Sequence, residues 1–489
     1  MTALVSALVL GTRVLQAQAT NEVEQLKRQL QQMQENFERA QREQKQQIEA
    51  LTQKLEALAK QQAAEAEKKK LEMQLAAELQ KNQPTPSAGS AAAPTSPWSP
   101  SQPITVARAG SAYMNISFDA LVAAGTSTAN DIDKLELGGH DPKQRGFTVQ
   151  NLETTFDGKV DPYFRGQANI VLQIDPNGET TIEAEEAYLE TMSLPWNVQV
   201  KAGQFFTEFG RLNPTHPHTW SFVDQPLVNG RFFGEDGLRS AGARLSWLTP
   251  TPFYSELFFT IQNSQGGTAF SFRNEHEGGF FFGRPHNQGR VKSLGDMLFV
   301  PRYAASFDLS DSQTIVAGVS AAFGPNGSGP DQGTQIYGAD LYWKWKPANA
   351  HAGFPFVSWQ TEAMLRRYEA GAFPGDPAPT PPLLALPAET LTDWGIYSQV
   401  LWGFKPRWVA GLRGDFVAPT ETAAYETILG RDPDRAQRWR ISPNLTWYPS
   451  EFSKIRLQYN YDNRDRIGVD HSVWLQFEFL LGAYAAHKF

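Results

Sequence analysis

Residue-by-residue alternation of apolar and polar side chains is the feature of this chain that most restricts its fold. In 438–447, RWRISPNLTW, the even positions are polar and the odd positions are apolar. In 455–462, IRLQYNYD, the odd positions are again apolar or aromatic and the even positions polar. A period of two residues is the geometry of a β-strand, whose successive side chains point to opposite faces of the sheet.

Sixteen such runs follow one another between residue 104 and the C-terminus. An even number of antiparallel strands brings both ends of a bacterial barrel to one side of the membrane. The runs are expected to begin near residues 111, 146, 163, 182, 197, 238, 253, 299, 313, 334, 355, 391, 406, 437, 453 and 471.

The connections between successive runs alternate between short turns and long loops, which places the two kinds on opposite sides of the predicted sheet. Short turns are expected after runs 2, 4, 6, 8, 12 and 14, for example at Asp161-Pro162 and at Tyr448-Pro449-Ser450. Long loops are expected after runs 1, 5, 7, 11 and 13, near residues 124–144, 206–237, 264–295, 369–389 and 418–436. This asymmetry is typical of outer-membrane barrels, and a soluble β-sandwich has no reason to show it. The predicted fold is all-β: a closed sixteen-stranded antiparallel transmembrane β-barrel, wide enough for a water-filled channel.

Three segments precede the alternating region. Residues 1–19 combine a short apolar stretch with the small-x-small sequence AQA, which is typical of a secretory signal peptide. The alternative is a helix that extends the next segment. Residues 20–82 carry apolar residues in steps of three and four, which predicts an α-helical coiled coil of two or three chains. Residues 83–103 are a Pro/Ala/Ser linker, so the barrel domain is expected over 104–489.

Composition excludes several classes of protein. The net charge of −8 argues against a nucleic-acid partner, and the absence of cysteine excludes disulfides and thiolate metal sites. After residue 19 no apolar run is long enough for a transmembrane helix. Aromatic residues make up 12% of the chain, which fits the aromatic girdles of a barrel.

The C-terminal residue of the chain is aromatic. Phe489 ends the alternating segment VWLQFEFLLGAYAAHKF. This ending resembles the signal by which the barrel-assembly machinery recognises its clients, and the alternative is an ordinary edge strand.

Two segments carry a family resemblance. VDPYFRGQANIVLQ (160–173) and VQVKAGQFFTEFGRLNP (198–214), with the order of strands from about residue 110 onward, resemble the phosphate-selective porin O/P family. The resemblance implies a sixteen-stranded trimeric channel behind a coiled coil, with a third outer loop that folds inward to narrow the pore. It does not by itself imply phosphate selectivity, because the family's anion preference goes with clustered lysines, which are few here.

The charged residues of the polar face and of the third outer loop are the candidates for lining the pore. Arginine is always charged and binds oxyanions with two donors, so a line of arginines favours anions. Glu183, Glu185 and Glu256 oppose such a field, so a mixed lumen with weak selectivity is an equal expectation. The pore-lining candidates are Arg165, Glu208, Arg211, Arg231, Glu235, Asp236, Arg239, Arg244, Arg438, Arg440 and Arg456.

Other site chemistry is sparse. His216 and His218 flank a proline in the third outer loop and supply half of a metal site, but a solvated loop is the favoured interpretation and no metal or cofactor is expected. No G-x-S-x-G, H-E-x-x-H or P-loop motif occurs, and His471 is the one histidine to check for a serine–histidine pair.

The expected function is that of an outer-membrane porin, not an enzyme. It would let small hydrophilic solutes or ions, such as phosphate, diffuse passively through a homotrimer in contact with outer-membrane lipid. The arm of residues 20–82 would lie in the periplasm. The alternative is a structural protein that tethers the envelope by binding peptidoglycan through this arm. A gated receptor with about 22 strands is excluded, because the first hundred residues contain no compact plug.

Overall fold

The computed structural model describes residues 104–175, 177–274, 279–286, 289–378 and 383–482. The predicted signal peptide, coiled coil, linker and terminal Phe489 lie outside these residues, so they stay predictions.

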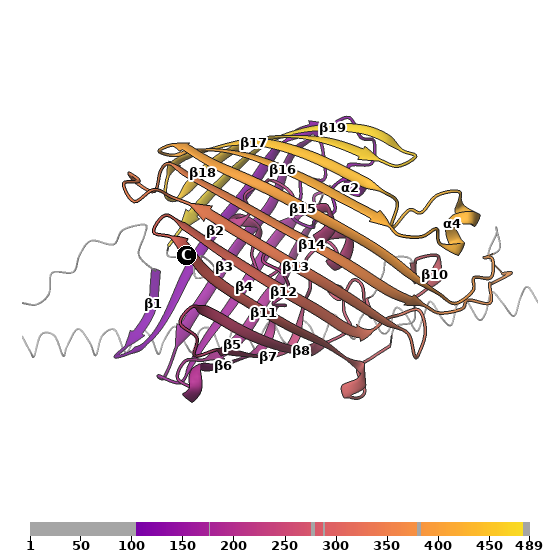
Figure 1. The fold of residues 1–489 in the computed structure, drawn as a ribbon, viewed down its shortest axis with the longest axis horizontal. Coiled ribbons are helices and arrows are strands. Elements are labelled where there is room, and N and C mark those ends of the chain that lie inside the picture. Colours follow the sequence, from indigo (N-terminus) through magenta and orange to yellow (C-terminus); the bar gives the residue numbers. More distant parts are fainter. Residues whose placement is uncertain (1–103, 176, 275–278, 287–288, 379–382, 483–489) are drawn as a thin grey trace, which may run out of the picture. The chain divides into compact units, whose positions relative to one another are not determined.

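Sixteen antiparallel strands form a closed barrel in this part of the chain (Figure 1). Each strand pairs with its neighbour in sequence, β8 pairs with β11, and β19 pairs with β2 to close the ring. The barrel strands are β2 (Ala112–Ser127), β3 (Gly146–Lys159), β4 (Phe164–Ile174), β5 (Thr180–Thr191), β6 (Val198–Phe206), β7 (Arg239–Leu248), β8 (Tyr254–Asn263), β11 (Met297–Ser310), β12 (Gln313–Pro325), β13 (Gly333–Trp345), β14 (Phe356–Ala370), β15 (Glu389–Lys405), β16 (Trp408–Pro419), β17 (Arg438–Ser450), β18 (Ser453–Arg464) and β19 (Gly468–Leu481).

The predicted barrel is confirmed strand by strand. Every strand begins within three residues of its predicted start. The five long loops that were predicted occur, all at one end of the barrel, here called the loop end. The opposite end carries the short connections and is here called the turn end. Its longest connection, residues 346–355, was not predicted to be a short turn.

An additional strand was not foreseen. β1 (Ile104–Ala109) forms a hairpin with the first residues of β2, pairing Ile104 with Ile116 and Ala109 with Ala112. β19 pairs with β2 only from Phe118 onward, so β1 occupies the part of the β2 edge that β19 leaves unpaired. The hairpin therefore satisfies backbone groups at the seam of the barrel.

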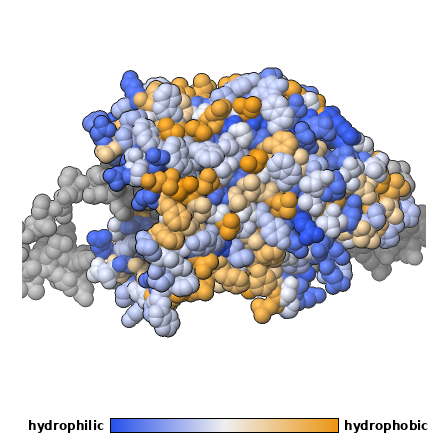
Figure 2. All heavy atoms as spheres, viewed as in Figure 1, coloured by the Kyte–Doolittle hydropathy of each residue, from blue (hydrophilic) through white to orange (hydrophobic). Residues whose placement is uncertain are grey.

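The predicted alternation places polar residues inside and apolar residues outside. In β18, Arg456, Gln458 and Asn460 are buried, whereas Leu457 and Tyr459 are exposed on the outer face. Figure 2 shows hydrophobic side chains spread over the strands that face the viewer. A wall that exposes large apolar side chains outward and buries polar ones inward is typical of a barrel surrounded by lipid.

Short helices lie in the long loops and between strands. The α-helices are α2 (Ile132–Leu135), α3 (Leu227–Phe233) and α4 (Ala424–Leu429), and the short 3-10 helices are η1 (Pro195–Asn197), η2 (Pro217–Thr219) and η4 (Leu294–Asp296). A two-stranded ribbon, β9 (Phe280–Phe281) with β10 (Arg284–Pro285), also lies in a loop. Within the described ranges, no helix is long and apolar enough to cross a membrane.

The barrel interior also contains an apolar core, which the alternation alone did not predict. Phe209, Phe232 and Phe233 from the loop after β6 pack with Val300 and Ile336 on the inner wall. These wall residues occupy inward positions that the pattern predicts to be polar. They are apolar because the loop folds onto them and removes both surfaces from water.

Candidate functional site

Residues 207–238, here called the inner loop, connect β6 to β7 and fold into the barrel. Backbone N–H groups of the loop donate to side chains of distant strands. Gly210 donates to Ser320 Oγ (3.1 Å) and Arg211 donates to Glu362 Oε2 (3.0 Å). Further along, the Val223 N–H donates to Gln458 Oε1 (2.8 Å). Because β12, β14 and β18 all contribute acceptors, the loop crosses the interior and does not project from the rim.

An acidic residue anchors the middle of the inner loop. Asp224 is fully buried and pairs with Arg413 Nη2 (2.7 Å) and with Arg440. Gln458 and Asn460 donate to the same carboxylate at 2.8 and 2.7 Å. Burial alone would raise the pKa of Asp224, but the two guanidinium groups lower it to about 2. The loop is thus held to β16, β17 and β18 by an ionised carboxylate.

Helix α3 forms the second half of the inner loop. The Leu227 N–H donates to Asp415 Oδ1 (3.1 Å), and Arg231 donates to the carbonyls of Arg435 and Ala436 (2.9 Å each). The helix ends at Gly234, whose φ of 82° suits glycine and where a Cβ would lie 2.9 Å from Phe270. The helix is therefore fixed at its start and at its end.

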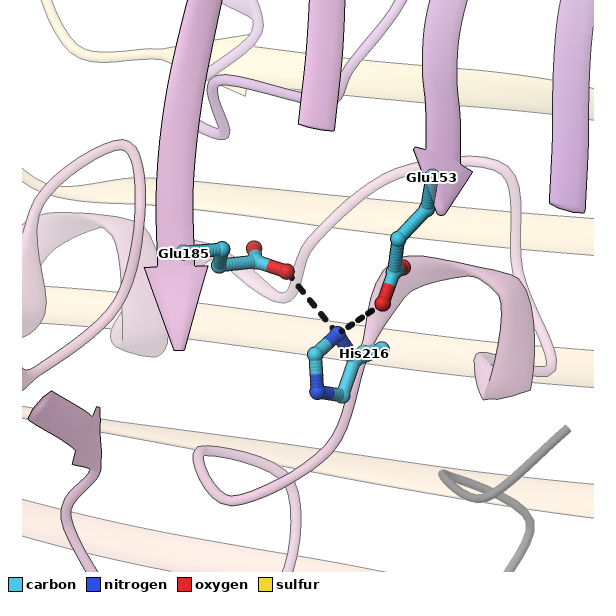
Figure 3. A group of neighbouring side chains, drawn as sticks. All are labelled: Glu153, Glu185 and His216. Carbon is cyan, nitrogen blue, oxygen red and sulfur yellow. Dashed lines mark ion pairs between the residues drawn. The ribbon is translucent and has the colours of Figure 1, made fainter. Parts of the chain in front are cut away.

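His216 and His218 are buried, so the prediction of a solvated loop was wrong. They are 4% and 1% exposed, because the inner loop places them against the inner wall. His216 Nε2 lies 2.9 Å from Glu186 Oε2, and its Nδ1 lies 2.9 Å from Glu185 Oε2 and 3.2 Å from Glu153 Oε1 (Figure 3). Burial alone would lower the pKa of His216, but the carboxylates of Glu153 and Glu185 raise it well above its usual value.

A β-bulge in β5 explains why two adjacent glutamates reach this histidine. Asn169 of β4 pairs with Glu186, but the next residue, Ile170, pairs with Ala184, so Glu185 is the extra residue. Both glutamates are buried inside, whereas strict alternation would turn one of them outward. The alternation identified Glu185 as an inward residue and missed Glu186.

Two cavities lie inside the barrel, one on each side of the inner loop. The turn-side cavity has a volume of about 880 Å³ and is lined by Glu208, Arg211 and Trp220 together with strand residues such as Tyr254. The loop-side cavity has a volume of about 500 Å³ and is lined by Arg231 and other loop residues. No described residue lines both cavities. The inner loop therefore separates the two.

Both cavities carry mixed charge. In the turn-side cavity, Arg244 pairs with Glu208 and donates to Gln199 Oε1 (2.7 Å), and Arg302 pairs with Asp340 at 2.6 Å. The charged residues that line the loop-side cavity are Asp131, Asp133, Lys134, Glu136, Arg231, Glu235, Arg366, Arg431, Asp432, Asp434, Arg438, Arg464 and Asp465. Acidic and basic residues are mixed in both linings, so the described lining residues do not form a continuous row of arginines.

Arg211 is the cation in the turn-side cavity that differs from the others. Its guanidinium stacks 4.0 Å from the centre of the Tyr342 ring and Nε donates to Gln360 Oε1 (3.3 Å). Among the described residues, no carboxylate forms an ion pair with this guanidinium. Its charge is therefore directed at the cavity and is not neutralised by a wall residue.

Some of the predicted pore-lining residues line a cavity, and the others are held in pairs in the wall. Glu208, Arg211 and Arg244 line the turn-side cavity, and Arg231, Glu235 and Arg438 line the loop-side cavity. Asp236 lines a smaller cavity of about 210 Å³ together with Glu235. The remaining candidates line neither of the two large cavities: Arg165 pairs with Glu190, Arg239 with Glu183, Arg440 with Asp462 and Asp224, and Arg456 donates to Gln476 and to the Trp220 carbonyl.

Several functional candidates were missed from the sequence. Arg302 lines the turn-side cavity and Arg366 lines the loop-side cavity. Arg413 holds the inner loop through Asp224. All three lie on the polar parity of predicted strands, so the signal was present. His471 lies on the outer face of β19, with Nδ1 2.6 Å from the Tyr459 hydroxyl, whereas the adjacent Ser472 is buried on the inner face.

The fold is similar to that of several solved structures. They include the outer membrane channel DcaP of Acinetobacter baumannii (14% identity, TM-score 0.48, 76% of this chain and 97% of that chain). They also include an anion-selective porin from Comamonas acidovorans (6% identity, TM-score 0.45, 76% and 100%). A third is OprB of Pseudomonas putida (10% identity, TM-score 0.45, 76% and 94%).

No family model matches the chain. A sequence relative is an uncharacterized protein of Aquifex aeolicus (strain VF5), which is 32% identical over 375 residues, covering 72% of this chain and 73% of the relative. An identity of this size over most of both chains indicates common descent and a common fold. The chain therefore belongs to the family of this Aquifex aeolicus protein.

Proposed function

We propose that the protein is an outer-membrane channel through which small hydrophilic solutes or ions diffuse passively. One observation carries this proposal: a closed barrel with a polar inner wall encloses a cavity on each side of an inward-folded loop. A solute that passes from one cavity to the other must pass the inner loop. In this proposal the inner loop is the constriction, and Arg211, Glu208 and Arg244 are the charges that a solute meets on its turn side.

The outer face supports a membrane location. Leu257, Val319 and Leu412 are 43%, 56% and 54% exposed near the middle of their strands. A closed barrel leaves no unpaired strand edge, so its backbone can be surrounded by lipid. Exposed aromatic residues gather at the turn end, as in the interfacial girdles of such barrels. These residues are Tyr163, Phe164, Trp196, Phe307, Trp402, Phe404 and Trp447.

The mixed charge of both cavities favours weak ion selectivity. In the turn-side cavity Arg244 and Arg302 are neutralised by carboxylates, whereas Arg211 stacks on Tyr342. We therefore expect a modest preference for anions, which includes phosphate among the permeating solutes without making it the specific substrate.

Planar bilayer recording tests the proposal. The purified full-length protein, added to a bilayer in a KCl gradient, is expected to give stepwise conductance with a reversal potential displaced slightly toward that of chloride. A folded barrel that inserts without conductance steps would contradict the channel function. Steps with a clear cation preference would contradict the anion preference alone.

Oligomeric assembly and the N-terminal arm of residues 20–82 are also part of the proposed function. We propose a homotrimer that the barrel-assembly machinery recognises through Phe489, with the arm of residues 20–82 in the periplasm. The heptad spacing of that arm favours self-association and also supports the second candidate function, attachment to peptidoglycan. Deleting residues 20–82 separates the two functions, because conductance survives if the barrel is the channel and peptidoglycan binding is lost if the arm is the tether.

A further inference from the structure

Three metal-ligating side chains from three segments meet beneath the inner loop. Glu153 comes from β3, Glu185 from the bulge of β5 and His216 from the inner loop, and one ligand atom from each lies within 4.8 Å of the others (Figure 3). All three side chains are at least 96% buried. The pore candidates Arg211 and Arg244 are not part of this group, so the group needs an explanation of its own.

The imidazole is oriented as a metal ligand would be. Nε2 lies 2.9 Å from Glu186 Oε2, so a proton on Nε2 would be bonded there, and an incoming ion that displaces the proton from Nδ1 would find the Nδ1 lone pair as its ligand. Nδ1 faces two further carboxylates, with Glu185 Oε2 2.9 Å and Glu153 Oε1 3.2 Å away. A carboxylate that fixes the distal nitrogen of a ligating histidine is the usual outer partner in protein metal sites.

The distances between the ligand atoms fit a common central ion. Zinc binds imidazole nitrogen and carboxylate oxygen at about 2.0–2.2 Å, so two ligand atoms of a tetrahedral site are about 3.4 Å apart. The observed separations of 2.9 and 3.2 Å are slightly shorter than this. Both oxygens approach Nδ1, so an ion that replaces the Nδ1 proton would have all three ligand atoms within reach.

Charge balance favours a cation at the same place. Asp119, Glu153, Glu185 and Glu186 are all buried here. The permanently charged guanidinium closest to them, that of Arg239, is 4.0 Å from Glu185 and also pairs with Glu183. Glu153 also accepts from the amides of Asn151 and Asn169, and two further histidines face the group, His218 at 3.5 Å from Glu153 and His140 at 3.5 Å from Glu185, so the four carboxylates are balanced by imidazoles and one shared guanidinium. Buried carboxylates are stable when they are paired or when they coordinate a metal.

We propose that His216 Nδ1, Glu153 and Glu185 bind a divalent transition-metal ion of the zinc type, with Glu186 as the group that orients His216. His218 lies beside this group, with its Nδ1 3.5 Å from Glu153 Oε2. The ion fastens the inner loop to β3 and β5, whereas Asp224 holds it to β16, β17 and β18. The site is separate from the channel function and does not depend on it.

Metal binding by the full-length protein tests the site. The protein is purified in detergent with its affinity tag removed, stripped with EDTA, dialysed into metal-free buffer and titrated with Zn²⁺ against a chromophoric chelator. About one Zn²⁺ per chain is expected, with a Co²⁺ derivative that absorbs in the visible range. A stripped wild-type protein that binds no Zn²⁺ would show instead that a protonated His216 balances the carboxylates, and would overturn the proposal.

Variants assign the ligands. His216→Asn is expected to abolish stoichiometric binding, and Glu186→Ala to weaken it by about 10- to 100-fold, as loss of an orienting partner does. His351→Asn and Glu451→Gln, which change exposed residues of turn-end connections, are matched controls that retain wild-type affinity. Gel mobility of unheated samples checks that each variant is folded. Wild-type affinity in folded His216→Asn would overturn the assignment, and if that variant does not fold, Glu186→Ala decides it.

Discussion

Arg211 shows how a single side chain can set the field inside the turn-side cavity. Its neighbours Arg244 and Arg302 are each neutralised by a carboxylate, whereas Arg211 rests on the Tyr342 ring and keeps its net charge. A cation on an aromatic face stays charged and stays in place. In the proposed channel, we therefore expect selectivity to depend more on this residue than on the number of arginines in the lumen.

Neutralising Arg211 is expected to reduce the anion preference. A unit charge about 6 Å from a permeating ion contributes about 0.4 kcal/mol in water with about 0.1 M salt, with opposite signs for chloride and potassium, so it changes the ratio of their local concentrations about threefold to fourfold. Arg211→Gln should therefore lower the permeability ratio of chloride to potassium about threefold, measured as the reversal potential in a KCl gradient. Arg407→Gln removes an equal charge from an exposed turn-end connection and should leave the ratio unchanged. An unchanged ratio in Arg211→Gln would show that the ions do not pass this residue.

Removing the Asp224 carboxylate is expected to loosen the inner loop. Asp224→Ala leaves Arg413 and Arg440 buried without one of their partners, and breaking a buried pair in this way costs about 3 kcal/mol. We expect a lower midpoint of thermal unfolding and larger fluctuations of the open-channel current. A variant with the wild-type midpoint and a quiet current would mean that the other contacts of the loop suffice.

At the scale of elements, the strands could be predicted from their own residues, whereas the inward fold of the loop after β6 was expected only from the family resemblance and its contacts were not predicted. Each strand carries its own signal, because inward and outward positions alternate within a few residues. The burial of His216 depends on where a 32-residue loop folds, and its partners are on β3 and β5. The β5 bulge and the β1 hairpin were also missed, and the sequence signal of the bulge is the adjacent pair Glu185 and Glu186, which breaks the alternation.

Shortening the inner loop tests its role as the constriction. Phe206 and Arg239 are paired at the end of β6 and the start of β7, so a four-residue Gly-Ser turn can replace residues 208–237 without disturbing the strands. Since the loop separates the two cavities, its removal should join them and raise the single-channel conductance. An unchanged conductance would place the narrowest point elsewhere.

At the scale of the whole molecule, the outer face determines where the protein can exist. The wall exposes Phe259, Val319 and Leu457 outward while the inner wall buries Arg456 and Gln458. A soluble protein with such a surface would aggregate, because contiguous exposed apolar patches of this extent are rare in soluble monomers. Sequence alternation predicted this arrangement correctly, but the mixed apolar and polar filling of the interior required the structure.

The folded protein is expected to require detergent and to resist it. Extraction from membranes should fail with salt and succeed with detergent, and unheated samples should migrate faster in SDS gels than heated ones, because the closed barrel stays compact. Far-ultraviolet circular dichroism should show β-structure that is lost on heating. A protein that is freely soluble without detergent would contradict the membrane location.

The contacts of the inner loop imply an order of assembly. The Arg211, Leu227 and Val223 N–H groups bond acceptors that lie 151, 188 and 235 residues further along the chain. During synthesis the loop therefore emerges long before the strands that hold it exist. Before β14, β16 and β18 are in place, the inner loop has none of these acceptors and cannot narrow the barrel. The constriction therefore forms only after the C-terminal strands have joined the sheet.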